Sequence, residues 1–206
     1  VSTQGPILTD NGGSILLYKS SGYEVGDVVS VSGTISSYGK GFQIGTADIT
    51  IEKSGTTTVT YPTPMEITGA MADELLTTRV NDEYAYYAKM TGTVAIGDYY
   101  NFILPDATKA QGSFDGATDE LKAQLSDGME CTIYGYFTSL SGGKYLNMVV
   151  TSVEPAAAVS TLALTVKSEK RYAYFKYNGT AYEATDIVAV QPEDYTAMGQ
   201  NYGNFT

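Results

Sequence analysis

Tyrosine is the side chain in this sequence best suited to hold a ligand, and several tyrosines stand beside glycine-containing turns. Tyr99 and Tyr100 follow a Gly-Asp turn, and Lys144 and Tyr145 follow a pair of glycines. An aromatic face offers apolar area and π-density to a sugar ring or a base, and the tyrosine hydroxyl adds a hydrogen bond. These residues predict a surface that binds neutral or weakly charged glycans.

A second turn, at residues 38–42, carries aromatic and basic residues at alternate positions: Tyr38, Lys40 and Phe42. Tyrosine also suits strands and half-buried contacts between domains, so a purely structural role stays open for all of these side chains. Adjacent strand residues point to opposite faces, and the sequence does not decide which of Tyr99 and Tyr100 faces outward. The candidate ligand-binding residues are Tyr99, Tyr100, Lys144, Tyr145, Tyr38, Lys40 and Phe42.

No set of residues in the sequence predicts catalysis. The chain has no histidine, which removes histidine-based triads and the commonest zinc and copper sites. Cys131 is the only cysteine in the sequence, so the chain forms no intramolecular disulfide. Cys131 lies on the inward side of a predicted strand, where we expect it to be a buried apolar residue. Acidic residues fall mostly in turns and helix starts, where solvation and capping explain them. We therefore expect a protein that is not an enzyme, with no cofactor and no metal.

Composition narrows the class of partner. Of 206 residues only 17% are charged, and the formal net charge is −11. Nucleic-acid affinity comes largely from neutralising phosphates, and the 12 lysines and arginines are scattered along the chain, so a nucleic-acid partner is disfavoured. The sequence contains no run of 18 apolar residues, so it predicts no transmembrane helix. The abundance of Gly, Ser, Thr and Tyr is typical of a secreted all-β protein.

Two stretches about a hundred residues apart follow the same pattern. In residues 26–35 and 128–137, apolar or large residues alternate with small or polar ones, and a second glycine follows the first after seven positions. Alternation with period two predicts a strand with one buried face. Gly33 and Gly135 fall on that inner face, where glycine favours the bend or bulge that curls a sheet into a barrel.

The repeat predicts the fold and its boundaries. We expect a mostly β protein with two tandem five-stranded barrels, at residues 1–60 and 61–156, and a C-terminal hairpin and helix segment at 157–206. Helices are predicted at 68–79 and from 118, and a hairpin turn at Asn178–Gly179. Five short strands with a helix before the fourth are the pattern of the OB-fold. The first strand of copy one is expected to be truncated at Val1, and the last segment to be incomplete at Thr206.

The segments 7–10, 26–33 and 127–135 resemble the tandem OB-like modules of outer-surface lipoproteins from gut anaerobes. Segments 177–182 and 192–199 resemble a domain of unknown function that accompanies those modules, although Tyr182 stands where that domain usually has Trp. The resemblance implies a location outside the cell or on the outer-membrane surface, and neighbouring domains in a longer chain. The quoted segments are turn and core signals rather than chemical motifs.

Two functions from different classes follow. The first is a non-catalytic surface module that binds an oligosaccharide or spaces and docks its neighbours. The second is a single-stranded nucleic-acid binder, since OB-folds bind such ligands on the face of strands two and three and the adjoining loops. The acidic net charge favours the first function.

Overall fold

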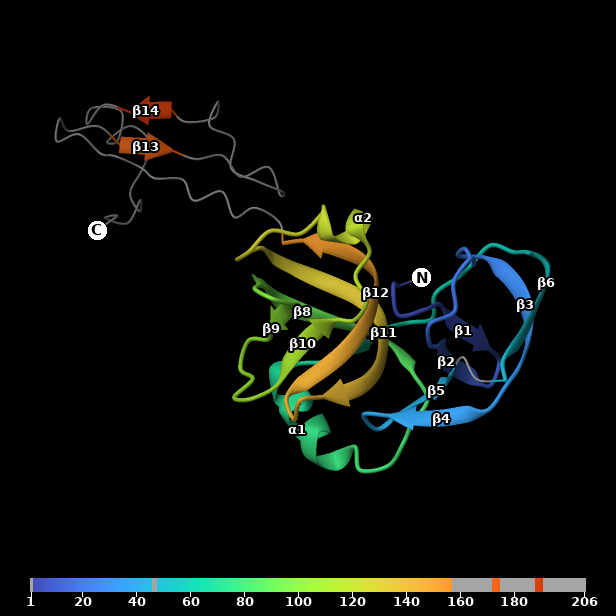
Figure 1. Cartoon of the computed structure of the whole chain (residues 1–206). Coiled ribbons are helices and arrows are strands. Elements are labelled where there is room, and N and C mark those ends of the chain that lie inside the picture. Colours follow the sequence, from blue (N-terminus) through green and yellow to red (C-terminus); the bar gives the residue numbers. More distant parts are fainter. Residues whose placement is uncertain (1, 46–47, 157–171, 175–187, 191–206) are drawn as a thin grey trace. The chain divides into compact units, whose positions relative to one another are not determined.

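In the computed structural model, residues 2–45, 48–156, 172–174 and 188–190 are described (Figure 1). Residues Val1–Ala156 form one compact unit, and Ala157–Thr206 form another. Both copies predicted from the sequence lie within the first unit. In the second unit, β13 (Tyr172–Tyr174) pairs antiparallel with β14 (Val188–Val190). The predicted turn at Asn178–Gly179 lies outside the described residues, which also do not test the helix expected in this C-terminal segment.

The second copy is a closed five-stranded barrel, coloured green to orange in Figure 1. Its strand order is β8-β9-β10-β12-β11, and the pairing of β11 with β8 closes it. All neighbours are antiparallel except β10 and β12. A short strand, β7, adds to β8 outside the ring. The strands are β7 (Met65–Glu66), β8 (Tyr86–Ile96), β9 (Tyr100–Ile103), β10 (Gln111–Phe114), β11 (Glu130–Ser141) and β12 (Tyr145–Pro155).

Two helices in the described residues accompany this barrel, and both were predicted. α1 (Gly69–Thr78) is capped by the hydroxyl of Thr68, and α2 (Asp119–Lys122) by that of Thr118. Helical spacing would put Met71 on the same face as Leu75, but Met71 is exposed. Ala72 is fully buried instead, with the two leucines of the next turn half-buried against the barrel core.

The barrel interior holds fifteen buried residues in one cluster, including Phe102, Ile133 and Phe137. Cys131 belongs to it and is only 1% exposed, which confirms the predicted burial. The β11–β12 register shifts next to Gly135, where an added Cβ would lie 2.4 Å from the carbonyl oxygen of Val149. Glycine is therefore required there, because the backbones of β11 and β12 approach closely at this irregularity.

The first copy forms an open structure instead of the second closed barrel that the sequence predicted. β1 (Ile7–Asp10), β2 (Gly13–Leu17), β5 (Gly41–Ile44) and β4 (Ile35–Tyr38) form one sheet in that order. β3 (Asp27–Ser32) and β6 (Thr50–Thr56) form a separate pair. The break falls at Gly33, so the bend expected there separates two short strands.

The pairings of the first copy nevertheless repeat those of the barrel. β1–β2 is antiparallel like β9–β10, and β2–β5 is parallel like β10–β12. β3–β6 and β4–β5 together match the long β11–β12 ladder. Among the described residues, no strand of the first copy occupies the place that β8 holds in the second. Its ring is therefore one strand short of closure.

Candidate functional site

A groove of about 760 Å³ lies between the barrel and the first copy. One wall comes from the turn before β9, from β9 and β10, and from the β11–β12 hairpin, and the other from β2, β4 and β5. The residues that line the groove are Gln4, Leu16, Tyr18, Tyr38, Gln43, Asp98, Tyr99, Tyr100, Asn101, Ser113, Phe114, Asp115, Ala117, Lys122, Ser139, Ser141, Gly142, Tyr145 and Asn147.

Three tyrosines form the barrel wall. Tyr99 lies in the bend before β9 and is 77% exposed, whereas Tyr100 opens the strand and packs partly against the barrel core. Strand alternation would send two adjacent side chains to opposite faces, but Tyr99 precedes the strand, and both tyrosines line the groove. Tyr145 starts β12, and the ammonium of Lys144 lies 4.6 Å from the centre of its ring.

Polar side chains of the β11–β12 hairpin hold one another in place on the same wall. The buried amide of Asn147 donates to the hydroxyl of Ser139 at 2.9 Å and accepts from the hydroxyl of Ser141 at 3.0 Å. These groups are fixed before any ligand arrives, so a ligand would meet hydrogen-bonding atoms that need little reordering.

The first copy contributes an aromatic and amide wall. Tyr38, at the end of β4, is 57% exposed, and Gln43 comes from the neighbouring strand β5. Tyr18 follows β2, with the ammonium of Lys19 at 5.2 Å from the centre of its ring. The groove therefore has tyrosines on both walls and amide side chains between them.

The charges that line the groove are mainly negative. Asp98 and Asp115 line it together with a single lysine, Lys122. Burial raises the pKa of Asp115, because the charged carboxylate loses hydration there. A carboxyl group in this position suits hydroxyl donors of a neutral ligand and opposes a phosphate group.

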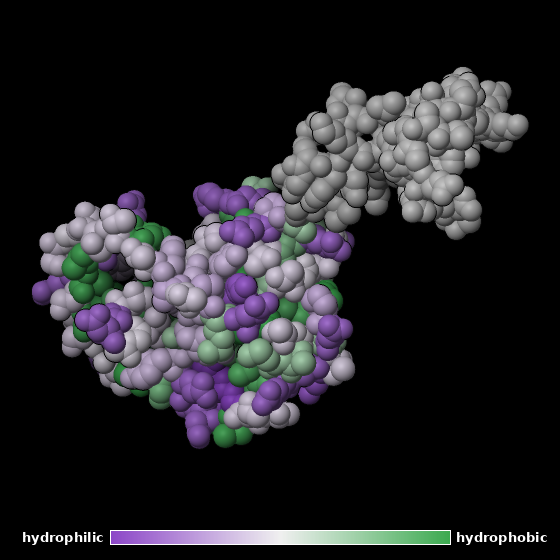
Figure 2. Space-filling model, turned by 180° about the vertical axis from the view of Figure 1, so that it is seen from behind, coloured by the Kyte–Doolittle hydropathy of each residue, from purple (hydrophilic) through white to green (hydrophobic). Residues whose placement is uncertain are grey.

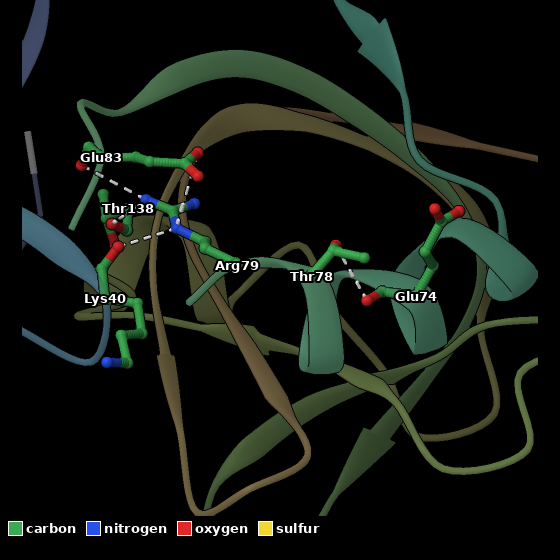
Figure 3. Close-up of polar contacts among 6 residues, drawn as sticks. All are labelled: Lys40, Glu74, Thr78, Arg79, Glu83 and Thr138. Carbon is green, nitrogen blue, oxygen red and sulfur yellow. Dashed lines mark hydrogen bonds and ion pairs between the residues drawn. The ribbon is translucent and has the colours of Figure 1, made fainter. Parts of the chain in front are cut away.

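Arg79 fixes the first copy against the barrel and so fixes the two walls (Figure 3). Its Nε donates to the carbonyl of Lys40 at 2.8 Å, and its Nη2 donates to the carbonyls of Glu83 and Thr138, each at 3.3 Å. The guanidinium lies 4.4 Å from the ring centre of Phe137, and its Nη1 is buried without a partner. Burial lowers the pKa of Arg79, as expected for a cation taken out of water.

The groove brings together four of the seven residues that the sequence singled out. Tyr99, Tyr100 and Tyr145 lie on one wall and Tyr38 on the other. Lys144 stands beside the groove, over the ring of Tyr145.

Lys40 and Phe42 are not among the lining residues. The backbone of Lys40 adopts a positive φ of 64°, and its carbonyl serves Arg79. Phe42 packs on Tyr84 with ring centres 5.1 Å apart.

Gln43 lines the groove in the place expected for Phe42. In the β4–β5 pairing Phe42 lies opposite Ser37 and Gln43 opposite Ser36, so strand alternation puts Gln43 on the face of Tyr38.

Sequence reasoning missed the amide and aromatic residues that complete the groove. Asn101 follows the predicted Tyr100, and Asn147 follows Tyr145 by two positions, so strand alternation alone could have added Asn147. Gln4, Tyr18 and Asp115 had no such signal, since their positions depend on how the two copies meet.

Other tyrosines follow the structural interpretation. Tyr87 and Tyr136 are buried, with ring centres 5.1 Å apart, and Tyr61 stacks on Tyr87 at the same distance. Burial raises the pKa of both Tyr61 and Tyr136. The structural role of tyrosine that the sequence left open therefore holds at these three positions.

No protein-family model, curated protein or solved structure significantly matches this chain. Within the part of the chain that the structure describes, no helix is long and apolar enough to cross a membrane. The same residues contain no group of three or more acidic or cysteine side chains placed to hold a metal ion.

Proposed function

We propose that this chain is a non-catalytic module of the cell surface that binds an oligosaccharide in the groove between its two copies. The observation that carries the proposal is the convergence of Tyr38, Tyr99, Tyr100 and Tyr145 on one groove from three separate turns. Aromatic faces suit the apolar faces of sugar rings, and the amides and hydroxyls between them suit sugar hydroxyl groups.

The barrel topology supports the same proposal. A closed ring of five strands with a parallel pair between the third and fifth, and a helix before the fourth, corresponds to an OB-fold. OB-folds bind ligands on strands two and three and the adjoining loops, which here are β9, β10, the turn before β9 and the β11–β12 turn. The groove lies over these elements.

Groove electrostatics favour a sugar over a single-stranded nucleic acid, the alternative ligand of such a fold. Two carboxylates and one lysine line the groove, in a chain with a net charge of −11. A nucleic-acid groove gathers cations along the backbone path and loses affinity steeply as salt rises.

The test is calorimetric titration of the full chain with a panel of neutral oligosaccharides and with single-stranded DNA, at two salt concentrations. Tyr145→Ala should weaken sugar binding about tenfold or more, which corresponds to about 1–3 kcal/mol for an aromatic stacking partner. Tyr145→Phe keeps the ring and should retain most of the affinity. Tyr84→Ala, a tyrosine outside the groove, serves as the matched control.

Binding that falls steeply with salt, for DNA only, would assign the groove to nucleic acid. No binding of either ligand class would leave the module as a spacer and would contradict the proposal.

A further inference from the structure

A polar row of small side chains crosses four strands on the outer face of the barrel. Asn101 of β9 lies opposite Ser113 of β10, which lies opposite Asn147 of β12. Asn147 in turn lies opposite Ser139 of β11, and all four residues line the groove. Neighbouring strands lie about 4.8 Å apart, so the polar row is about 14 Å long. Its amides and hydroxyls can bind several hydroxyl groups of an oligosaccharide that lies across the strands.

A single carboxylate stands beside the polar row. The backbone N–H of Asp115 donates to the carbonyl of Met148 at 2.8 Å, so the β10–β12 pairing continues one residue past the end of β10. Strand alternation therefore puts Asp115 on the same face as Ser113, about 7 Å farther along the strand. Both residues line the groove, so a ligand over the polar row comes within reach of this carboxylate.

Among the described residues, the carboxylate of Asp115 has no partner for its charge. Asp115 is half-buried, and burial raises its pKa with no hydrogen bond or cation to offset the loss of hydration. Lys122, the lysine in the groove lining, pairs with Asp119 at 3.2 Å. Asp98, the other acidic residue in the lining, is exposed in the bend before β9. A half-buried charge without a partner is unfavourable, and a bound cation would offset that cost.

Tyrosine rings at the groove can take up a cation, because two of them already do so. The ammonium of Lys19 lies 5.2 Å from the ring centre of Tyr18, and that of Lys144 lies 4.6 Å from the ring centre of Tyr145. The negative face of an aromatic ring attracts a cation, and Tyr99, on the same wall as Tyr145, is 77% exposed. A positively charged ligand therefore meets favourable groups both at the rings and at the half-buried carboxylate.

Diffuse attraction is not sufficient to select such a ligand. The net charge of −11 attracts any cation, and strongly hydrophilic side chains, in purple, are scattered over the face shown in Figure 2. Salt screens charges that are exposed to water, whereas a half-buried charge is screened much less. Selection therefore depends on Asp115, the half-buried carboxylate of the groove lining.

We propose that the groove selects an amino sugar, whose ammonium pairs with Asp115 while its ring and hydroxyl groups lie over the tyrosines and the polar row. This inference rests on the proposed sugar-binding function and names the class of sugar. A charge-assisted hydrogen bond is about twice as strong as a neutral one, so a sugar with a free amine is preferred to one whose amine is acetylated. A sugar that carries a carboxylate or a sulfate is disfavoured, because its charge has the same sign as that of Asp115.

The experiment is calorimetric titration of the full chain with a matched pair of probes, an oligomer of glucosamine and its N-acetylated counterpart of the same length. The titrations are made at about 0.15 M salt and about pH 6, where the glucosamine amines are charged and an ordinary carboxyl group is ionised. We expect the glucosamine oligomer to bind at least about tenfold more tightly than the acetylated one. Tetralysine, a cationic peptide without sugar rings, should bind much more weakly than the glucosamine oligomer.

Three chain variants locate the preference. Asp115→Asn keeps the size of the side chain and removes its charge, so the two oligomers should bind with similar affinity. Glu52→Gln removes one charge at an exposed position of β6, outside the groove lining, and should keep the preference. Tyr145→Ala should weaken the binding of both oligomers, since its ring serves sugar binding in general. The preference of the unaltered chain does not depend on whether Asp115→Asn folds.

Equal binding of the two oligomers, tighter binding of the acetylated one, or a preference that persists in Asp115→Asn would each overturn the amino-sugar assignment and leave the sugar-binding function standing. Tetralysine binding as tight as that of the glucosamine oligomer would reduce the attraction to diffuse charge and would also overturn the assignment. If neither oligomer nor any neutral sugar of the panel binds, both the assignment and the proposed function fail.

Discussion

The two copies share a pattern of strand pairing and differ by one strand, and that strand decides how much core each can bury. In the barrel, β8 joins β9 to β11, and fifteen buried residues form one cluster. In the first copy the corresponding edges stay apart, and the core cluster contains three buried residues. Closure rather than local sequence therefore sets the burial, because the alternating residues of β3 face inward but have nothing to close over them.

The two copies also differ in the stability that each brings to its wall of the groove. The closed barrel provides one wall of the groove, and the first copy provides the second wall. Arg79 joins the two copies, together with backbone hydrogen bonds such as that from the N–H of Thr3 to the carbonyl of Gly116. Sites are most exact when rigid elements carry them, and mobile ones allow a ligand to enter. The comparison predicts that the first copy exchanges and unfolds more readily than the barrel.

The comparison is tested most strongly by equivalent core truncations in the two copies. Ile133→Ala should destabilise the chain by about 2–5 kcal/mol, because Ile133 is fully buried in the barrel. Val31→Ala, at the corresponding position of the first copy, should cost less than about 1.5 kcal/mol, since Val31 is only half-buried. Urea denaturation monitored by circular dichroism measures both. Equal costs would show that the first copy is closed in solution.

The second test removes the contacts that Arg79 makes between the copies. Arg79→Met should cost about 2–4 kcal/mol, because three backbone carbonyls lose their donor and an arginine side chain leaves a buried site. The two copies should then unfold in separate steps, and sugar affinity should fall with the loss of the shared groove. Lys89→Met is the control, since it breaks only the exposed ion pair with Glu66. A single cooperative transition in Arg79→Met would contradict the linking role.

Much of this contrast could be predicted from the sequence, and the part that could not has a physical reason. Alternation around Ile133 and Val31 predicted both strands, and the glycines predicted the bends, because these signals are local. Closure depends on a strand at long sequence separation, and β8 has no counterpart among the described residues of the first copy. A repeat in sequence therefore predicted two barrels where the structure forms one.

The lining of the groove was also predicted only in part. Tyr99, Tyr100, Tyr145 and Tyr38 were predicted from turn composition and aromatic chemistry. Gln43 replaced Phe42 because the β4–β5 pairing puts Phe42 on the face opposite to that of Tyr38, and this pairing was not predicted from the sequence. The remaining lining residues became neighbours only through the contact between the copies, which no local pattern encodes.

Acid sensitivity should differ between the copies as well. Asp73 accepts four hydrogen bonds from residues 108–110, at 2.6–2.9 Å, and these lower its pKa below the ordinary value of 3.8. In the first copy, the backbone N–H of Glu24 and then the ammonium of Lys53 lower the pKa of Asp27. A depressed folded-state pKa gives stability that is present above the unfolded pKa and lost as pH falls below it.

Both carboxylates should therefore contribute to a loss of stability below about pH 4, with Asp73 contributing more. Asp73→Asn should flatten the acid limb of a plot of unfolding free energy against pH more than Asp27→Asn does. Denaturation at pH 3 and pH 6 measures the slope. An acid limb unchanged by Asp73→Asn would show that the loop at residues 108–110 is held by other contacts.

The smallest expected effect concerns thiol reactivity, which compares the interiors of the two copies directly. Cys131 is buried in the barrel, and burial raises its pKa, so little reactive thiolate is accessible. Val29 occupies the corresponding position in β3 and is half-buried in the open first copy. A cysteine introduced by Val29→Cys should react with a thiol reagent at least about tenfold faster than Cys131. This ratio corresponds to a difference of about 1.4 kcal/mol in the free energy needed to expose the thiol. Equally slow reaction at both sites would mean that the first copy is as closed as the barrel.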